Sequence, residues 1–208
     1  MRLVAESFAW PFRGHWHGRW LIGLVLVLLL PLTFIPVLGY AVAATRAAEL
    51  DPSQGPPAWR LSARLIYDGS WTTLAIAITV APFAIAWNPL AGTLPVSDPV
   101  IAHAIALFVV ALPWGLLVLL LLPHATAAYA STGHFHDLFD VGASLHGVRR
   151  DFAVWNTVAA AMVTAWVVGI ACVGLLCVGL VPGIFYAILV SAHAAAALHR
   201  QGSPAPAG

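Results

Sequence analysis

Charge is scarce in this sequence. Only 8% of the 208 residues are charged and 61% are hydrophobic, whereas an ordinary soluble domain carries roughly 25% charged residues. A soluble fold of this size could not cover its surface with so few charges. The formal net charge of +1 also provides no basic surface for nucleic acid, so no nucleic-acid partner is expected. The composition therefore predicts a protein that lies in a membrane.

Lysine is absent, cysteine is rare, and the common enzyme motifs are missing. The two cysteines, Cys172 and Cys177, lie five residues apart in an apolar run. That spacing puts them on different faces of a helix and supports neither a metal site nor a redox pair. The chain holds no HExxH, GxSxG or P-loop motif and no pair of aspartates inside an apolar run. We therefore expect a protein that is not an enzyme and that binds no metal.

Long apolar runs are what the sequence does have. A bilayer core is crossed by about 20 helical residues, and five runs approach or exceed that length. The prediction is an all-α polytopic transmembrane helical bundle, a single integral-membrane domain over residues 1–201 with a flexible C-terminal tail at 202–208. The apolar segments are 21–44, 71–87, 100–129, 152–177 and 180–199.

The first apolar segment is interrupted by Pro31 and Pro36, which break or kink a helix. If all five segments cross, the nine arginines divide three against six. If 21–44 turns back between the two prolines, all nine lie on one side. Since cytoplasmic loops collect arginine, we favour four full spans plus a re-entrant first segment, with the arginine-rich loops on the cytoplasmic side of a plasma or inner membrane. A kinked full span stays the alternative.

Three polar segments are predicted to lie in the membrane interface: 1–20, 56–68 and 131–151. The first mixes arginine and histidine with aromatic rings, and such rings favour the headgroup layer. A short amphipathic helix is expected from Trp59 to Tyr67. Apolar residues at helical spacing predict a second amphipathic helix over 131–151.

The last two apolar segments are expected to form a tightly packed hairpin with a hinge near Pro182. Small residues recur every four positions in both halves, and such ladders let helix backbones approach closely in lipid. The predicted packing residues are Ala161, Ala165 and Gly169 in the first half and Gly183, Ala187, Ser191 and Ala195 in the second.

Three histidines, His103, His124 and His193, lie in or near the apolar segments. Ionisable residues are costly in a membrane and so invite functional hypotheses. His193 and His124 are therefore candidates to bind a pigment or a haem iron, although a hydrogen-bonded structural histidine is the simpler interpretation. No cofactor is assigned. No acidic residue lies inside a predicted segment, so a proton-coupled carrier would lack its usual carboxylate.

A histidine and two aspartates in the 131–151 segment have a spacing that is also found between metal ligands. His136 and Asp140 are four residues apart and would share a helix face, with Asp137 alongside. A fourth ligand is not evident, and a solvated face of an interfacial helix is the simpler interpretation. This segment is therefore not assigned as a metal site.

Several short motifs follow one another along the chain. They are Glu6-Ser7-Phe8, Pro11-Phe12, Ile35-Pro36-Val37-Leu38-Gly39-Tyr40, Pro57-Ala58-Trp59, Asp68-Gly69, Tyr129-Ala130, Phe185-Tyr186-Ala187 and Leu189-Val190-Ser191-Ala192-His193. In their order and spacing, residues 6–201 resemble the prokaryotic integral-membrane family catalogued as domain of unknown function 4013. Family members are usually richer in acidic residues and lysine between these motifs. The resemblance implies a multi-pass membrane fold and no known activity.

These observations favour one functional hypothesis and leave two alternatives. The leading hypothesis is a non-catalytic accessory or scaffold subunit that packs against membrane lipids or other membrane subunits. The first alternative is a small transporter-like or lipid-handling protein, which a mid-membrane cavity lined by Tyr40, Tyr186 or His193 would favour. The second is a cofactor- or pigment-contacting subunit of a photosynthetic or respiratory complex.

Overall fold

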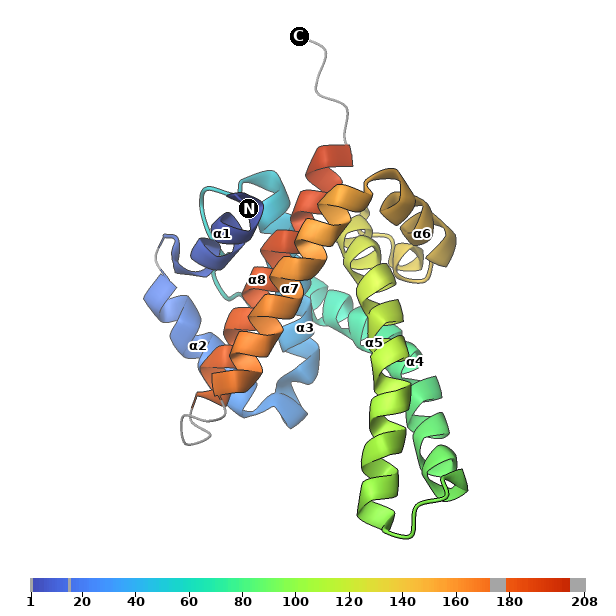
Figure 1. Ribbon diagram of the computed structural model, residues 1–208. Coiled ribbons are helices and arrows are strands. Elements are labelled where there is room, and N and C mark those ends of the chain that lie inside the picture. The colour runs from blue at the N-terminus through green and yellow to red at the C-terminus, as the bar shows by residue number, and fades with distance from the viewer. Residues whose placement is uncertain (1, 15, 173–178, 203–208) are drawn as a thin grey trace.

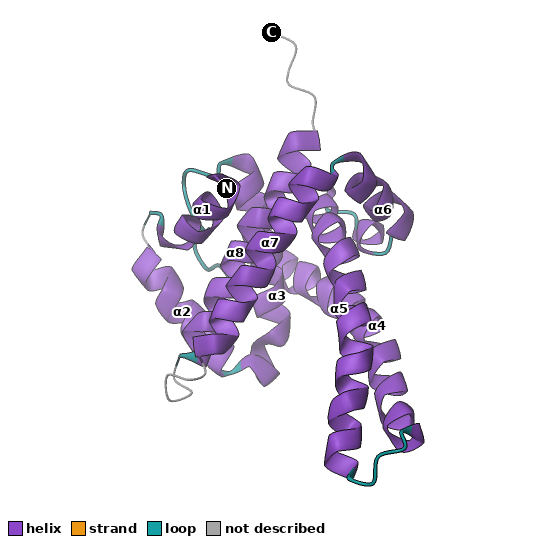
Figure 2. Cartoon of the chain, in the orientation of Figure 1, coloured by secondary structure: helices purple, strands orange, loops and turns teal. Residues whose placement is uncertain are grey.

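The computed structural model describes residues 2–14, 16–172 and 179–202. Within these ranges the chain forms eight α-helices and two short 3-10 helices, and no strand (Figure 1, Figure 2). Five of the described helices are long and apolar enough to cross a membrane. The prediction of an all-α bundle of membrane-spanning helices is confirmed.

The N-terminal segment packs onto the bundle. α1 (Arg2–Ala9) contacts the two C-terminal helices, and the 3-10 helix η1 (Trp10–Phe12) follows it. Residues 1–20 were expected to place aromatic rings among the lipid headgroups. Instead the Trp10 side chain is fully buried in the core, while Phe12 stays half exposed. The segment therefore closes one side of the core as well as reaching its surface.

The first apolar segment forms two helices, α2 (Trp16–Leu28) and α3 (Leu30–Leu50), that turn back on each other at Leu29. The start of α2 and the loop after α3 are held together, because the Trp59 indole N–H donates to the Arg19 carbonyl at 3.0 Å. The predicted turn between Pro31 and Pro36 is wrong in position. Pro31 lies in the first turn of α3, where a missing N–H is tolerated, and Pro36 lies inside that helix.

The next two helices are much longer than the sequence predicted. α4 runs from Ala63 to Thr93 and α5 from Pro99 to Thr132. The expected start of a helix at Trp59 is wrong, because residues 56–62 are not helical and α4 begins at Ala63. Ser62 caps α4 by accepting a hydrogen bond from the Leu65 N–H at 3.2 Å. Helix α4 also includes Asp68, so an acidic residue does lie inside an apolar helix.

Helices α4 and α5 form a hairpin, here called the arm, which projects past the other helices (Figure 1). At 1.5 Å per residue, 31 and 34 residues give lengths of about 46 and 51 Å. The 20 residues of α7, from Phe152 to Ala171, give about 30 Å, close to the thickness of a bilayer core. The arm is therefore longer than its neighbours, and its tip extends beyond their ends (Figure 1).

The 131–151 segment is not one helix. α5 ends at Thr132 and is capped by Gly133, whose φ of 75° is left-handed and suits glycine. A short 3-10 helix, η2 (Phe135–Leu138), and then α6 (Val141–Arg150) follow. Asp140 separates them, since its carboxylate caps α6 by accepting the Ala143 N–H at 2.7 Å. The predicted surface helix is therefore reduced to α6.

The C-terminal hairpin consists of α7 and α8 (Leu180–Gly202) and has the closest crossing in this half of the chain. A Cβ on Gly183 would lie 2.5 Å from the carbonyl oxygen of Gly169, so neither position has room for a side chain. Pro182 lies in the first turn of α8. Cys177, most of the connection between the helices, and all but the first residue of the predicted 202–208 tail lie outside the described residues.

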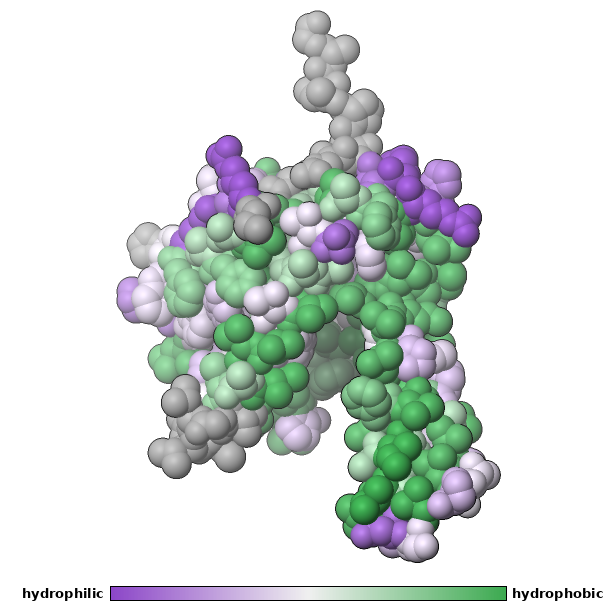
Figure 3. All heavy atoms as spheres, in the orientation of Figure 1, coloured by the Kyte–Doolittle hydropathy of each residue, from purple (hydrophilic) through white to green (hydrophobic). Residues whose placement is uncertain are grey.

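Hydrophilic surface gathers at one end of the molecule, here called the polar end (Figure 3). α1, α6 and the C-terminal end of α8 lie there (Figure 1). The arginines belong to these elements, or to the loop and helix ends beside them. The opposite, far end holds the turn at Leu29, the last turn of α7, the first turn of α8, and the tip of the arm (Figure 1).

Candidate functional site

A cavity of about 550 Å³ lies between α3, α4, α5, α7 and α8. It opens beside the arm, where Figure 3 shows a hollow between the arm and the α7–α8 hairpin. Its lining is almost entirely apolar. Representative members, one from each helix in chain order, are Val42, Ile76, Leu119, Val167 and Ile188.

The few polar groups in the lining already have partners. The hydroxyls of Thr45, Thr72 and Thr126 each donate to the carbonyl four residues earlier in their own helix, at 2.8 to 3.0 Å. The Trp166 indole N–H donates to the Ser191 hydroxyl at 3.2 Å. Because these donors are satisfied inside the protein, the cavity presents methyl and methylene groups to whatever fills it.

A charged cluster lies at the polar end of this cavity, around the buried carboxylate of Asp68, which is 3% exposed. The Tyr129 hydroxyl donates to Asp68 Oδ1 at 2.8 Å, and Arg46 Nη1 donates to Oδ2 at 3.3 Å. Arg64 Nε is 3.9 Å from the same oxygen. Asp68 therefore joins α3, α4 and α5, one helical turn beyond the cavity-lining Thr72 and Thr126.

Arg46 makes a second link within this cluster. Its Nε donates to the Ala130 carbonyl at 2.8 Å, so the guanidinium bridges the end of α3 to the end of α5. Its remaining nitrogen, Nη2, is buried without a hydrogen-bond partner among the described residues. Two guanidinium groups thus surround one carboxylate, which leaves an excess of one positive charge at this end of the cavity.

Sequence reasoning missed this cluster because it placed Asp68 at the end of the interfacial segment 56–68, outside the apolar segments. One local signal was present: Arg64 and Asp68 are four residues apart, the spacing of an ion pair on a helix face. The other partner, Tyr129, lies 61 residues further on, and no local pattern connects it to Asp68.

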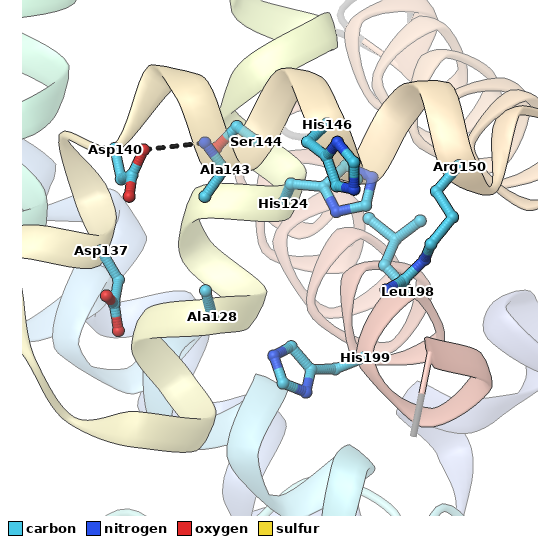
Figure 4. A pocket seen from close by; sticks show the side chains of 11 residues that line it. His124, Ala128, Asp137, Asp140, Ala143, Ser144, His146, Arg150, Leu198 and His199 are labelled. Atoms are coloured by element: carbon cyan, nitrogen blue, oxygen red, sulfur yellow. Dashed lines mark hydrogen bonds between the residues drawn. The ribbon is translucent and has the colours of Figure 1, made fainter. Parts of the chain in front are cut away.

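A second, polar pocket of about 340 Å³ lies at the polar end between α5, η2, α6 and α8 (Figure 4). Its lining includes His124 from α5, Asp137 from η2, His146 and Arg150 from α6, and His199 from α8. His199 is held by Glu49, with Nδ1 and Oε1 3.3 Å apart. The His124 ring packs on Gly147, where a Cβ would lie 2.9 Å from the ring atoms.

The structure places the other candidate ligand, His193, in the packed core. It is 1% exposed, its Nδ1 is 2.9 Å from the Ser7 hydroxyl, and its ring lies against Trp10. It lines neither of the two cavities. His103 lies in the arm, where its Nε2 is 3.2 Å from Asn88 Oδ1. The structure therefore does not bring His103, His124 and His193 together, and cofactor binding stays a prediction.

The residues weighed for a metal are also separated. His136 lies in η2, whereas Asp140 caps α6, so the two do not share the face of one helix. Asp137 accepts a hydrogen bond from the Thr132 hydroxyl. Within residues 2–14, 16–172 and 179–202, no group of three or more histidine, cysteine, aspartate or glutamate side chains is placed to hold a metal.

The two predicted small-residue ladders face each other across the α7–α8 crossing. Ala161 and Ala165 are fully buried on α7, and so are Ala187 and, nearly so, Ala195 on α8. Gly169 and Gly183 make the closest backbone contact. Ser191 lies at the edge of the crossing, where it lines the apolar cavity.

Comparison with known proteins identifies one family. The profile described as "Protein of unknown function (DUF4013)" matches residues 22–190. No curated protein and no solved structure matches the chain. The match begins in α2 and ends within α8, so it covers the Asp68 cluster and most of the lining of the cavity and of the polar pocket, but not α1.

Proposed function

This chain belongs to the DUF4013 family of proteins of unknown function, and we propose that it is a non-catalytic accessory or scaffold component of its membrane that holds the hydrocarbon chain of a lipid between its helices. The observation that carries the proposal is the apolar cavity of about 550 Å³. Pockets of about 300–1,000 Å³ are the size of ordinary ligand sites.

The cavity is expected to be filled by its surroundings, because it opens on the side of the bundle, beside the arm (Figure 3). Whatever surrounds the helices at this depth can therefore reach its apolar lining. Water is a poor filler, since the lining offers it almost no free hydrogen-bonding group. Inside a bilayer, the abundant apolar material is lipid hydrocarbon.

The charged cluster supports an amphiphilic occupant. Arg46 and Arg64 lie at the polar end of the cavity, where the polar part of a lipid would lie if its chain entered between the helices. The excess positive charge there suits an ester carbonyl or a phosphate. The proposed partners are therefore membrane lipids, with a helix of another membrane subunit as the competing occupant.

The transporter alternative has less support. Its expected signature was a cavity lined by Tyr40, Tyr186 or His193, and none of these lines the apolar cavity. The Tyr40 hydroxyl donates to the Pro57 carbonyl and the Tyr186 hydroxyl to the Phe8 carbonyl, so both tyrosines fasten loops. The pigment-binding alternative is tested by the absorbance of the purified protein, which a bound haem or pigment would colour.

The test of the proposal uses two glycines that have open space around them. Gly115 lines the cavity and Gly92 does not, and a Cβ at either would meet nothing within 4 Å. Gly115→Leu is expected to fill part of the cavity without a clash at the backbone. After purification in mild detergent, native mass spectrometry should find at least several-fold less co-purified lipid on this variant than on the wild type.

Gly92→Leu is the matched control, because it adds the same side chain to the arm outside the cavity. It should retain lipid as the wild type does. Equal lipid on all three proteins would overturn the proposal. Loss of a co-purifying membrane protein from Gly115→Leu, with lipid unchanged, would show that a partner helix fills the cavity instead.

A further inference from the structure

We infer that the polar pocket beside α6 is a binding site for a zwitterionic group that carries both a phosphate and an ammonium, such as the headgroup of phosphatidylethanolamine. The pocket holds carboxylates at one end and imidazole and guanidinium groups at the other (Figure 4). It lies at the polar end of the molecule, beside the surface helix α6, where the headgroups of a bilayer lie.

The acidic end consists of Asp137 and Asp140. Each carboxylate uses one oxygen for a structural bond: Asp137 Oδ2 accepts from the Thr132 hydroxyl and Asp140 Oδ1 accepts from the Ala143 N–H. In the described part of the chain, their other oxygens make no hydrogen bond. Two acceptors that carry negative charge are therefore available to an ammonium group.

The basic end consists of His124, His146 and Arg150. Arg150 uses only Nε for its bond to Asp151, at 2.9 Å, so its two terminal nitrogens are available for a phosphate, which a guanidinium binds in a fork. His124 Nε2 is buried and has no hydrogen-bond partner among the described residues. One end of the pocket thus has unused carboxylate oxygens, and the other has unused guanidinium and imidazole nitrogens.

Simpler ligands fit less well. A lone anion would meet two carboxylates, and a lone amine would meet a guanidinium that stays charged. A metal ion lacks a set of ligands, since the described residues contain no group of three suitable side chains. A ligand with both charges satisfies both ends at once.

The pocket is separate from the apolar cavity. His124 lies two residues from Leu122 and from Thr126, which line the cavity. Residues two apart on a helix point in nearly opposite directions, because each residue turns the helix by about 100°. α5 thus lies between the two sites, and the proposal stands or falls independently of the lipid chain in the cavity.

The experiment measures lipid retention by the purified full-length protein in native mass spectrometry. Phosphatidylethanolamine, phosphatidylcholine and phosphatidylglycerol with the same acyl chains are added in turn. Phosphatidylethanolamine should be retained about tenfold better than the other two, the ordinary effect of one charge-assisted hydrogen bond. Phosphatidylcholine cannot donate to the carboxylates, and phosphatidylglycerol has no ammonium. Equal retention of all three lipids would overturn the proposal.

Matched variants assign the effect to the pocket. Arg150→Gln and Asp140→Asn should each reduce retention of phosphatidylethanolamine about tenfold. Asparagine caps a helix as well as aspartate does, so Asp140→Asn keeps α6 intact, and Arg150→Lys should restore much of the binding. The controls are Arg149→Gln and Asp51→Asn, which change the same charges outside the pocket. A loss in the controls equal to that in the pocket variants would refute the assignment.

A soluble competitor identifies the source of the ligand. Glycerophosphoethanolamine carries the same two charges without acyl chains. If it displaces the lipid at millimolar concentration, the pocket recognises the headgroup alone. If the lipid binds and the soluble compound does not, the ligand is the membrane lipid. Binding of neither would contradict the proposal.

Discussion

Asp68 shows how much depends on single residues in this protein. Its carboxylate is buried, and its three partners come from three helices: Arg64 from the preceding turn of α4, Arg46 from α3, and Tyr129 from α5, 61 residues further along the chain. A buried charge without partners costs several kcal/mol. The cluster therefore holds α3, α4 and α5 in one arrangement, because any other arrangement leaves a charge buried and unpaired.

Asp68→Asn is expected to destabilise the protein by about 3 kcal/mol, since it leaves the partly buried Arg46 guanidinium without its counter-charge. The measurement is the midpoint of thermal unfolding in detergent. The control, Glu6→Gln, removes a carboxylate from an arginine pair that is largely exposed and should cost less than about 1 kcal/mol. Equal effects of the two substitutions would show that the Asp68 cluster does not stabilise the helices.

Single contacts also connect the motifs that carry the family resemblance. Ser7 is bonded to His193, the Tyr40 ring stacks on Trp59 at 3.7 Å, and Asp68 is bonded to Tyr129. Each motif thus meets another motif from a distant part of the chain. The sequence revealed the members of these pairs but not the pairing, because pairing depends on which helices lie side by side.

Glycine contacts set the packing of whole helices. α3 and α4 cross where a Cβ on Gly69 would lie 2.0 Å from the Ile35 carbonyl oxygen, and one on Gly39 would lie 2.0 Å from the Leu65 carbonyl oxygen. The second crossing, between Gly169 and Gly183, has the same character. In a membrane such close contacts supply the van der Waals attraction that holds helices together, because apolar side chains gain nothing by leaving lipid.

Gly69→Ala should force α3 and α4 apart and destabilise the protein by about 1–3 kcal/mol, the usual cost of overpacking. The clash is with backbone, so a side-chain rotation cannot relieve it. Gly92→Ala, on the same helix with nothing within 4 Å of its Cβ, should be neutral or stabilising, because alanine favours helices. Thermal unfolding of both variants checks this difference, and a tolerated Gly69→Ala would contradict the close crossing.

The element boundaries show where local patterns are reliable. Apolar runs located every long helix, yet they misplaced the ends of several. α4 continues through Pro82 and Pro89, because membrane helices tolerate proline where neighbours or hydroxyls satisfy the freed backbone groups. The turn at Leu29 has no proline or glycine at that position. It is stabilised instead by the Thr33 hydroxyl, which donates to the carbonyls of Leu26 and Leu29.

At the scale of the whole molecule, the α2–α3 hairpin, the arm and the α7–α8 hairpin differ in how far they reach into the membrane. The arm is about 46 to 51 Å long, and its tip carries Thr93, Ser97 and Asp98. The turn at Leu29 lies between leucines, and residues 172–179 contain no charged residue. We therefore expect only the arm to present a polar tip beyond the far side of the bilayer, with the Leu29 turn inside the hydrocarbon.

Cysteine labelling tests this topology in a background with Cys172 and Cys177 replaced by alanine. Leu3→Cys and Asp51→Cys should react with an impermeant maleimide from the same side, the cytoplasmic side if the arginines set the orientation. Ser97→Cys should react from the opposite side. Leu29→Cys should react from neither, because hydrocarbon shields it.

Two results would contradict this arrangement. Labelling of Leu3→Cys and Asp51→Cys from opposite sides would show that the first apolar segment crosses the membrane. Rapid labelling of Leu29→Cys from the far side would show that the turn reaches water. Only the first result would also overturn the placement of the arginines on one side.

Composition and local pattern alone determined that this protein is a helical membrane protein, and they favoured an arrangement with its arginines on one side. Both conclusions depend on the preference of each residue for water, headgroup or hydrocarbon, which does not require knowledge of the partners. Tertiary structure alone decided the rest: the Asp68–Tyr129 bond, the turn at Leu29, the apolar cavity and the polar pocket. The bond, the cavity and the pocket each join residues that are distant in the chain, and their meeting depends on how closely small residues let the helices approach. The turn at Leu29 is local but has no proline or glycine at that position to mark it in the sequence.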